Sequence, residues 1–224
     1  MKYKIVGEPL PTVLCDLEPG EVMISENGGR SWVKGDITTE TKGGGAGKMF
    51  GRMMSGESLF LSHYTAVTHA QIAFSSSFPG SIRAVELASG QSIICQKTAF
   101  LAATEGVELS TFIQRKLGAG FFGGEGFIMQ KVTGPGTAFI ELDGYSVEYD
   151  LADGEKLVCD TGVVSMMDET CKLEIEKVKG LKNKVLGGEG FFDTVVYGPG
   201  KVTVQTMTAG GLAATLIPFL PQGK

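Results

Sequence analysis

The sequence predicts an all-β fold, an antiparallel β-sandwich assembled from internal repeats with one short helix near the C-terminus. The pattern Gly-Gly-Glu-Gly-Phe followed by Gly-Pro-Gly occurs at 123–136 and again at 187–200, an offset of 64 positions (187 minus 123). Short apolar runs alternate with turn residues, and 33 of the 224 residues are glycine. This combination is typical of strands joined by tight turns.

The repeat extends beyond these signature motifs. Residues 87–95 read Leu-Ala-Ser-Gly-Gln-Ser-Ile-Ile-Cys and residues 151–159 read Leu-Ala-Asp-Gly-Glu-Lys-Leu-Val-Cys, with the same offset. A diverged first copy opens with Leu-Glu-Pro-Gly-Glu-Val and later carries Gly-Glu-Ser-Leu-Phe. Self-similarity at a fixed period indicates repeated structural units. We therefore expect one domain, 1–224, whose pseudo-repeats cover about 17–74, 87–142 and 151–206, followed by a tail at 207–224.

Residues 105–117 are ambiguous when taken alone, because they also fit an amphipathic helix. The corresponding segment of the last copy places Cys171, Leu173 and Ile175 at alternating positions, which is the period of a strand. Equivalent copies share a backbone, so both segments are predicted to be strands.

Two Gly-Pro-Gly tripeptides are predicted to form type II turns, because proline presets φ at the first central position and glycine accepts a positive φ at the second. Strand-like runs lie on both sides of each tripeptide, so each turn is expected to close a β-hairpin. The turn residues are Gly134, Pro135 and Gly136 in one copy and Gly198, Pro199 and Gly200 in the other.

The segment 207–220 is small and apolar, and we expect a short helix there that packs on the domain or on a second subunit. Pro218 and Pro221 end this helix, because proline cannot continue it. No apolar run approaches the roughly 20 residues of a membrane-spanning helix. The N-terminus also lacks the apolar core of a secretion signal.

Four cysteines occur without a Cys-x-x-Cys pair, which argues against a zinc ribbon or a thioredoxin-type redox motif. Cys95 and Cys159 occupy matching repeat positions within apolar runs, so both are expected to be buried structural thiols. Reduced cysteines suit a cytoplasmic location.

The net charge of −5 gives the chain no general attraction for nucleic acid or anionic lipid. The densest basic run comprises Lys172, Lys177, Lys179, Lys182 and Lys184. Glu174 and Glu176 interrupt this run, which favours a solvated strand face over a nucleic-acid-binding stripe.

Three motif-like stretches are weak candidates for chemistry. Gly118–Gly123 matches G-x-G-x-x-G, but a strand follows it where a dinucleotide site needs a helix. The glycines at 43–48 resemble a phosphate loop but lack its first glycine and its Ser or Thr, and are better explained as a loop. His63 and His69 have no H-x-H partner, which favours structural roles over metal binding.

A sharper hypothesis concerns one glutamate position in each copy, occupied by Glu57, Glu125 and Glu189. Around a pseudo-threefold axis these carboxylates would converge and bind a cation through oxygen ligands. The simpler interpretation is that each glutamate accepts main-chain N–H bonds in a glycine turn or faces water, because converging carboxylates repel one another without a counter-ion.

These residues carry a family resemblance. The stretches GGEGFIMQKVTGPG and GGEGFFDTVVYGPG, with SGESLFLSHYTA upstream and FLAATEGVELS between, resemble the altered-inheritance-of-mitochondria, or mitochondrial biogenesis, family over about residues 5–206. The resemblance implies an all-β fold like that of the tryptophan RNA-binding attenuator protein, and homo-oligomers, among which we favour a trimer. The eukaryotic branch is associated with the mitochondrial inner membrane and its organisation. The family implies no catalytic residues and no cofactor.

The sequence therefore favours a non-catalytic oligomeric scaffold or binding protein of the cytoplasm. Nucleic-acid binding by analogy with the fold is a second reading, which a shared fold does not by itself support. An enzyme of unrecognised class is the third, and a deep pocket with perturbed carboxylates would favour it.

Overall fold

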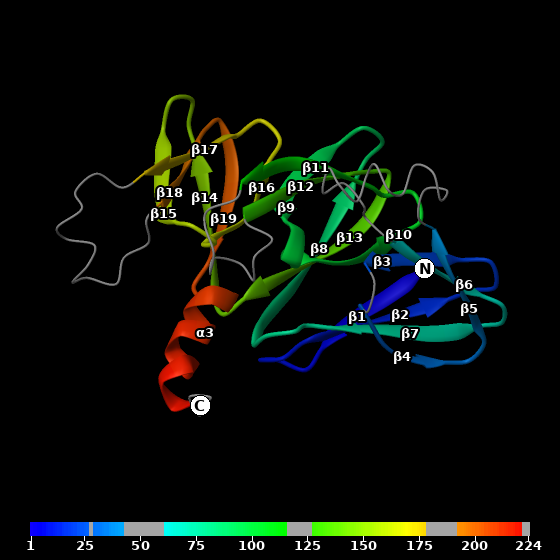
Figure 1. Ribbon diagram of the computed structural model, residues 1–224. Coiled ribbons are helices and arrows are strands. Elements are labelled where there is room, and N and C mark those ends of the chain that lie inside the picture. The colour runs from blue at the N-terminus through cyan, green and yellow to red at the C-terminus, as the bar shows by residue number, and fades with distance from the viewer. Residues whose placement is uncertain (27–28, 43–60, 116–126, 178–191, 221–224) are drawn as a thin grey trace, which may run out of the picture.

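The structure is a computed structural model, and it describes residues 1–26, 29–42, 61–115, 127–177 and 192–220. Within these ranges the chain forms antiparallel strands and one short α-helix near the C-terminus, which confirms the predicted all-β class. Figure 1 shows the sheets side by side, with the helix projecting from them.

The strands follow one another in three sets of six, which we call units 1, 2 and 3. Unit 1 is preceded by β1 (Lys2–Val6) and comprises β2 (Thr12–Leu17), β3 (Val22–Glu26), β4 (Arg30–Lys34), β5 (Ile37–Lys42), β6 (Leu61–Ala66) and β7 (Ala70–Ser75). Unit 2 comprises β8 (Gly80–Leu87), β9 (Ser92–Gln96), β10 (Phe100–Thr104), β11 (Glu108–Arg115), β12 (Phe127–Thr133) and β13 (Gly136–Asp143). Unit 3 comprises β14 (Ser146–Leu151), β15 (Lys156–Asp160), β16 (Val164–Asp168), β17 (Lys172–Lys177), β18 (Phe192–Tyr197) and β19 (Gly200–Gln205).

Each unit divides its strands between two sheets in the same order. In unit 2, β11-β12-β9 form one half and β10-β13-β8 the other; in unit 3 the corresponding halves are β17-β18-β15 and β16-β19-β14. Halves of neighbouring units then join edge to edge. The result is four sheets: A (β1-β2-β7-β4), B (β5-β6-β3-β10-β13-β8), C (β11-β12-β9-β16-β19-β14) and D (β15-β18-β17).

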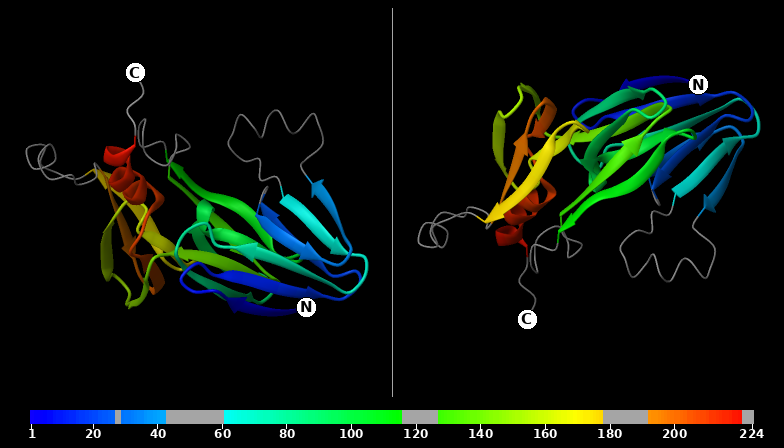
Figure 2. Two further views of the ribbon diagram at one scale, coloured as in Figure 1. Left: turned by 90° about the horizontal axis from the view of Figure 1, so that it is seen from below. Right: turned by 90° about the horizontal axis from the view of Figure 1, so that it is seen from above.

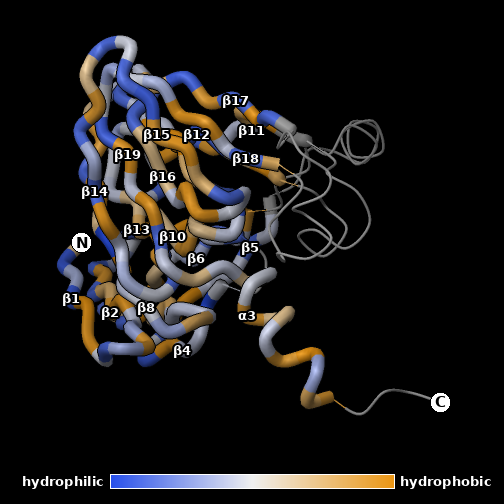
Figure 3. The backbone as a smooth tube through the Cα atoms, turned by 90° about the vertical axis from the view of Figure 1, so that its left-hand side faces the viewer, coloured by the Kyte–Doolittle hydropathy of each residue, from blue (hydrophilic) through white to orange (hydrophobic). Residues whose placement is uncertain are grey.

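Three apolar layers hold the four sheets together. Phe74 of sheet A packs with Phe139 of sheet B, and Ile140 of sheet B packs in a second cluster with Val132 of sheet C. A third cluster lies between sheets C and D and contains Val196. Sheets B and C therefore have an apolar cluster on each face, and strands at the middle of these sheets, such as β9 and β10, are buried along nearly their whole length. Figure 2 shows the stacked sheets from below and from above, and Figure 3 shows hydrophobic and hydrophilic residues alternating along the strands.

The two ambiguous segments are strands, as predicted: 105–117 contains β11 and the corresponding stretch contains β17. The hairpin prediction at the Gly-Pro-Gly tripeptides is wrong. Gly134–Gly136 carries the chain from β12 in sheet C to β13 in sheet B, and Gly198–Gly200 carries it from β18 in sheet D to β19 in sheet C. The tripeptides are thus crossings between layers, because each flanking strand pairs with strands from elsewhere in the chain.

The type II geometry is also wrong at both crossings. The Gly134–Pro135 and Gly198–Pro199 peptide bonds are cis, and φ is 146° at Gly136 and 138° at Gly200, far from the roughly +80° of a type II turn. Glycine is still required there, since a Cβ on Gly136 would lie 2.3 Å from Thr104 Oγ1.

The C-terminal helix α3 (Ala209–Leu216) begins at Thr208, whose hydroxyl oxygen accepts the N–H of Gly211 at 3.0 Å. A 3-10 turn, η3 (Ile217–Phe219), follows and contains Pro218. No residue of α3 is buried, and Leu216, Ile217 and Phe219 are exposed. The expected helix is present, but within this chain it borders a cleft rather than a packed core.

Candidate functional site

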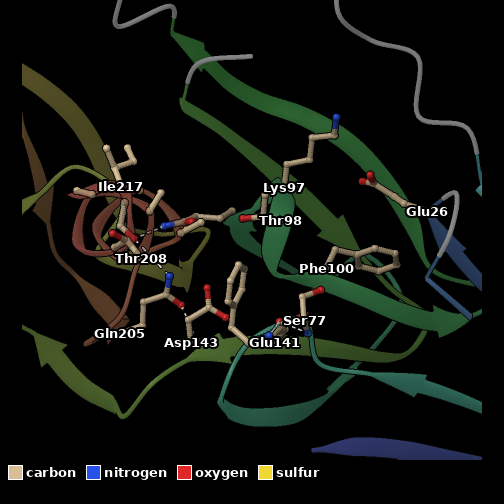
Figure 4. Close-up of a pocket in the computed structure, with 17 residues that line it drawn as sticks. Glu26, Ser77, Lys97, Thr98, Phe100, Glu141, Asp143, Gln205, Thr208 and Ile217 are labelled. Carbon is tan, nitrogen blue, oxygen red and sulfur yellow. Dashed lines mark hydrogen bonds between the residues drawn. The ribbon is translucent and has the colours of Figure 1, made fainter. Parts of the chain in front are cut away.

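A cleft of about 790 Å³ lies where units 1, 2 and 3 meet beside α3 (Figure 4). Unit 2 supplies much of its floor through β13 and through the 3-10 turn η1 (Lys97–Ala99) that follows β9. The helix supplies the facing wall. The residues that line the cleft are Glu26, Ser77, Phe78, Gln96, Lys97, Thr98, Phe100, Glu141, Asp143, Gly162, Gln205, Thr208, Ala209, Gly210, Ala213, Ala214 and Ile217.

Glu141 is buried at the floor of the cleft. It lies on β13 between the apolar residues Ile140 and Leu142. Its Oε1 accepts the main-chain N–H of Ser77 at 2.7 Å and that of Phe78 at 3.2 Å. Burial raises the pKa of this carboxyl, while those N–H bonds partly oppose the rise. Glu141 therefore fixes the segment that joins unit 1 to unit 2.

Asp143 lies two residues further along the same strand, on the same side. Burial, followed by the nearby Glu141 charge, raises the pKa of the Asp143 carboxyl to about 6. Within the described part of the chain its carboxylate has no hydrogen bond and no ion pair, and only its main-chain groups are bonded. Figure 4 shows the Asp143 carboxyl facing the cleft and Glu141 beside Ser77, with the ammonium of Lys97 pointing away from both acids.

Two glutamine side chains, one from unit 2 and one from unit 3, make hydrogen bonds where these units meet at the floor. Gln96 Nε2 donates to the carbonyl oxygens of Gly162 at 2.8 Å and Val164 at 2.5 Å. Gln205 Oε1 accepts the N–H of Asp143 at 3.0 Å, and its Nε2 donates to Gly162 at 3.4 Å. Both N–H groups of the Gln96 amide are therefore used within the floor, and neither glutamine donates to the Asp143 carboxylate, which faces the cleft as an acceptor.

Apolar side chains form much of the remaining wall. Phe78 and Phe100 line the sheet side, while Ala213, Ala214 and Ile217 line the helix side. The cleft thus offers aromatic and aliphatic surface next to carboxyl oxygens. Such a site suits a ligand with an apolar body and a hydrogen-bond donor or positive group. No cysteine or histidine is among the described residues that line it.

The predicted cation site cannot be placed, because Glu57, Glu125 and Glu189 lie outside the described residues, as do 43–48 and 118–123. In the described ranges no three His, Cys, Asp or Glu side chains come together as metal ligands. Lys172 and Glu174 of the basic run form an ion pair on β17 at 2.6 Å. That pair fits the solvated strand face that the sequence suggests.

All four cysteines are free. Cys95 is buried, as expected, but the burial predicted for Cys159 is wrong, because Cys159 is only partly buried. Its strand, β15, is at the edge of sheet D, whereas β9 lies inside sheet C. Burial raises the pKa of the Cys159 thiol to about 11, so it is weakly reactive at neutral pH.

Sequence reasoning did not single out Glu141 or Asp143. The available signal is the run Ile140-Glu141-Leu142-Asp143, which places two acids in an otherwise apolar strand. The repeat offset adds a second signal, since Gln205 occupies the position that corresponds to Glu141 and Met207 the position of Asp143 (205 minus 141 and 207 minus 143, both 64).

None of the helices in the described ranges has both the length and the apolarity needed to cross a bilayer.

Comparison with known proteins identifies relatives of the chain. The family described as "Mitochondrial biogenesis AIM24" matches residues 3–207. An uncharacterized protein of Streptococcus pyogenes serotype M6 is 29% identical over 220 residues, which cover 94% of this chain and 87% of that protein. The crystal structure of a Streptococcus pyogenes protein matches with a TM-score of 0.79 at 24% identity, over 98% of this chain and 99% of the other. The structural match concerns the fold.

Proposed function

Because the chain belongs to the mitochondrial biogenesis AIM24 family, we propose that it is a non-catalytic, homo-oligomeric scaffold or binding protein. The observation that carries the binding role is the cleft beside α3, where apolar walls meet the Asp143 carboxylate. A cavity of this size is typical of small-molecule sites. No cysteine or histidine lines the cleft among the described residues, so the lining favours binding over catalysis by a cysteine nucleophile.

The proposal assigns the cleft a ligand with a positive group and an apolar body. Among its ionisable lining residues, Glu26, Glu141 and Asp143 are acidic and Lys97 is basic. Charge balance therefore favours a cation. A cytoplasmic setting, in which the four free thiols stay reduced, fits the same picture. By family association the scaffold would act in membrane organisation.

Native mass spectrometry of the protein as purified tests both parts of the proposal, because it reports subunit number and retained small molecules together. We expect a homo-oligomer, with a trimer favoured. A thermal-shift series with n-hexylamine, hexanol and hexanoate then tests the cleft. These probes share one alkyl body, so hexylamine should stabilise most. A monomer with equal responses to all three probes would contradict the proposal.

One observation supports a second candidate, an enzyme of unrecognised class. Two carboxyls with raised pKa values in one cleft are a pattern that acid–base catalysts share. Comparing Asp143→Asn with wild type in activity screens tests this candidate. Activity that disappears in the variant would favour the enzyme over the scaffold.

A further inference from the structure

Two junctions inside the chain join neighbouring units in the same way. At the first, β10 of unit 2 pairs with β3 of unit 1, and Ala103 lies opposite Ile24. At the second, β16 of unit 3 pairs with β9 of unit 2, and Met167 lies opposite Ile94. Both pairings are antiparallel and build the six-stranded sheets B and C.

The register is also the same at both junctions. Ala103 and Met167 are 64 positions apart (167 minus 103), which is the repeat offset. Ile24 and Ile94 occupy the same place in β3 and β9, each two residues before the strand ends. One pairing rule, with a fixed register, therefore joins each unit to the next.

One strand at each end of the stack lacks the pairing partner that its counterparts have in the other units. The strand of unit 1 that corresponds to β10 and β16 is β4, which pairs only with β7 in sheet A. The strand of unit 3 that corresponds to β3 and β9 is β15, which pairs only with β18 in sheet D. Sheets A and D lie at opposite ends of the molecule in Figures 1 and 2, so these two edges do not meet within one chain.

Side-chain exposure marks both strands as incomplete. Val158 of β15 is 52% exposed, whereas the residues at its position in β3 and β9, Ile24 and Ile94, are 1% and 0% exposed. Trp32 of β4 is 48% exposed, whereas Ala102 at the same place in β10 is 0% exposed. Open apolar edges of this kind are templates for pairing with another chain.

The open strand β4 has the shape of its paired counterparts. Its register with β7 shifts between Arg30 and Trp32, as that of β10 with β13 shifts between Phe100 and Ala102. The strand β16 has the same irregularity between Val164 and Met166. β-Bulges bend a strand and re-aim its side chains, so β4 presents the same bent edge that β10 and β16 use for pairing.

We infer that β4 of one copy pairs with β15 of a second copy, antiparallel and head to tail, with Val33 opposite Val158. This inference rests on the proposed homo-oligomer and specifies its interface. Copying the register of β16 with β9, where Met166 faces Cys95, places Trp32 opposite Cys159. The pairing buries Val158 and Trp32 and brings the Arg30 end of β4 to the Asp160 end of β15, where the charges are opposite.

This interface is heterologous, because it joins two different edges of the same protein. Heterologous contacts form rings when the rotation between copies closes and filaments when it does not. The joined sheets D and A would form a composite sheet like B and C, so each further copy continues the stack that the chain already builds internally.

The native thiol of Cys159 allows a direct test of the register. Opposed Cα atoms in an antiparallel pair lie about 4.5–5.5 Å apart, within the range that a disulfide bridges. Oxidation of the Trp32→Cys variant should therefore link copies into covalent multimers on a non-reducing gel. The other three cysteines are buried and should not contribute. Mild alkaline pH and a copper oxidant would offset the raised pKa of Cys159.

Two controls define the outcome. Adding Cys159→Ser to the Trp32→Cys variant should abolish the links, and Val33→Cys alone should link poorly, because neighbouring side chains point to opposite faces of the strand. An oligomer in native mass spectra without Trp32→Cys links would overturn the register and leave the proposed homo-oligomer standing. A monomeric wild type would overturn both.

A second variant tests the same interface independently of whether Trp32→Cys folds correctly. Val158→Lys should reduce the native mass to that of one chain and keep the circular dichroism of the wild type. The matched control is Tyr149→Lys on β14, an exposed residue on a sheet edge whose counterpart β8 is also an edge. This control should keep the wild-type mass. Loss of the oligomer in both variants, or in neither, would contradict the interface.

Discussion

Glu141 and Gln205 perform the same task in successive units. Glu141 accepts the N–H of Ser77 at 2.7 Å from the segment that joins units 1 and 2. Gln205 accepts the N–H of Asp143 at 3.0 Å, where unit 2 leads into unit 3. One residue is an acid and the other an amide, so the structural task requires an oxygen acceptor but no charge. The acid in unit 2 is therefore an addition to what the fold requires.

Replacing Glu141 by Gln should flatten the dependence of stability on pH. Burial raises the folded-state pKa of Glu141 above its ordinary value of 4.5. The protonated acid is thus favoured in the folded protein, and its contribution is lost as the pH rises from about 4.5 through the raised pKa. The variant keeps the acceptor oxygen, so at pH 7 it should be at least as stable as wild type.

Urea unfolding at pH 4, 5.5 and 7 measures this effect. The reciprocal change, Gln205→Glu, is the matched control, because a carboxylate there would face the carbonyl of Gly162 in place of an N–H donor. It should lose about 1–3 kcal/mol at neutral pH. If the free energy of unfolding depended more steeply on pH in Glu141→Gln than in wild type, the raised pKa assigned to Glu141 would be contradicted.

Replacing Asp143 by Asn should raise stability at pH 7 and 8. The carboxyl pKa is raised from 3.8 to about 6, so the folded protein loses stability as the pH rises between these values. The gain is reduced by the partial exposure of the group and should be about 1 kcal/mol, or about 2–4 °C in Tm for a chain of this size. Differential scanning calorimetry at pH 4 and pH 7.5 tests this, with no gain expected at pH 4.

The same variant separates stability from binding. If Asp143 holds the positive group of a ligand, Asp143→Asn should abolish the thermal shift caused by hexylamine and leave the response to hexanol unchanged. Retention of the full hexylamine response would remove Asp143 from the binding site.

Local patterns and the repeat predicted strand identity well. The period at Cys171, Leu173 and Ile175 identified β17, and the repeat extended this assignment to β11. Strand partners were not predictable in the same way. The strands β12 and β13 are neighbours in sequence but belong to sheets C and B. Six successive residues of β13 are buried, so its pattern gives no indication of which layer the strand joins.

The candidate site was less predictable than the fold. Glu141 and Asp143 carry no motif, and their environment depends on Ser77, Gln205 and α3, which are distant in the sequence. The raised pKa values arise mainly from burial, which is a property of the assembled layers. The predicted glutamate site, in contrast, remains a prediction, because its residues lie outside the described ranges.

Replacing Gly136 by Val should destabilise the fold strongly. The residue has a φ of 146°, and a Cβ would lie 2.3 Å from Thr104 Oγ1 and 2.9 Å from Val107 Cγ2. Conformational strain and steric conflict act together, so we expect a loss of roughly 3 kcal/mol or more. Chemical denaturation measures the loss.

Gly154→Val is the matched control for Gly136→Val. Gly154 has a φ of 75° but nothing within 4 Å of a built Cβ, so this variant reports conformational strain alone, about 1–2 kcal/mol. Equal losses in the two variants would show that the close approach at Gly136 has no energetic weight. Gly200, which has a φ of 138° at the second crossing, should behave like Gly136.

Replacing Gln96 by Leu should loosen unit 3 from unit 2. Gln96 is buried, and its Nε2 donates to the carbonyl oxygens of Gly162 and Val164. Leucine has similar volume but no donor, so buried acceptors lose a partner at a cost of about 1–3 kcal/mol. Hydrogen exchange should report faster opening of β16 than of β2, because the lost bonds lie at the junction of units 2 and 3.

The surface control is Gln91→Ala. The Gln91 side chain accepts an exposed N–H, so its loss should lower the free energy of unfolding by less than about 1 kcal/mol. If Gln96→Leu accelerated hydrogen exchange equally in all strands, the units would unfold together and Gln96 would not stabilise the junction of units 2 and 3 in particular.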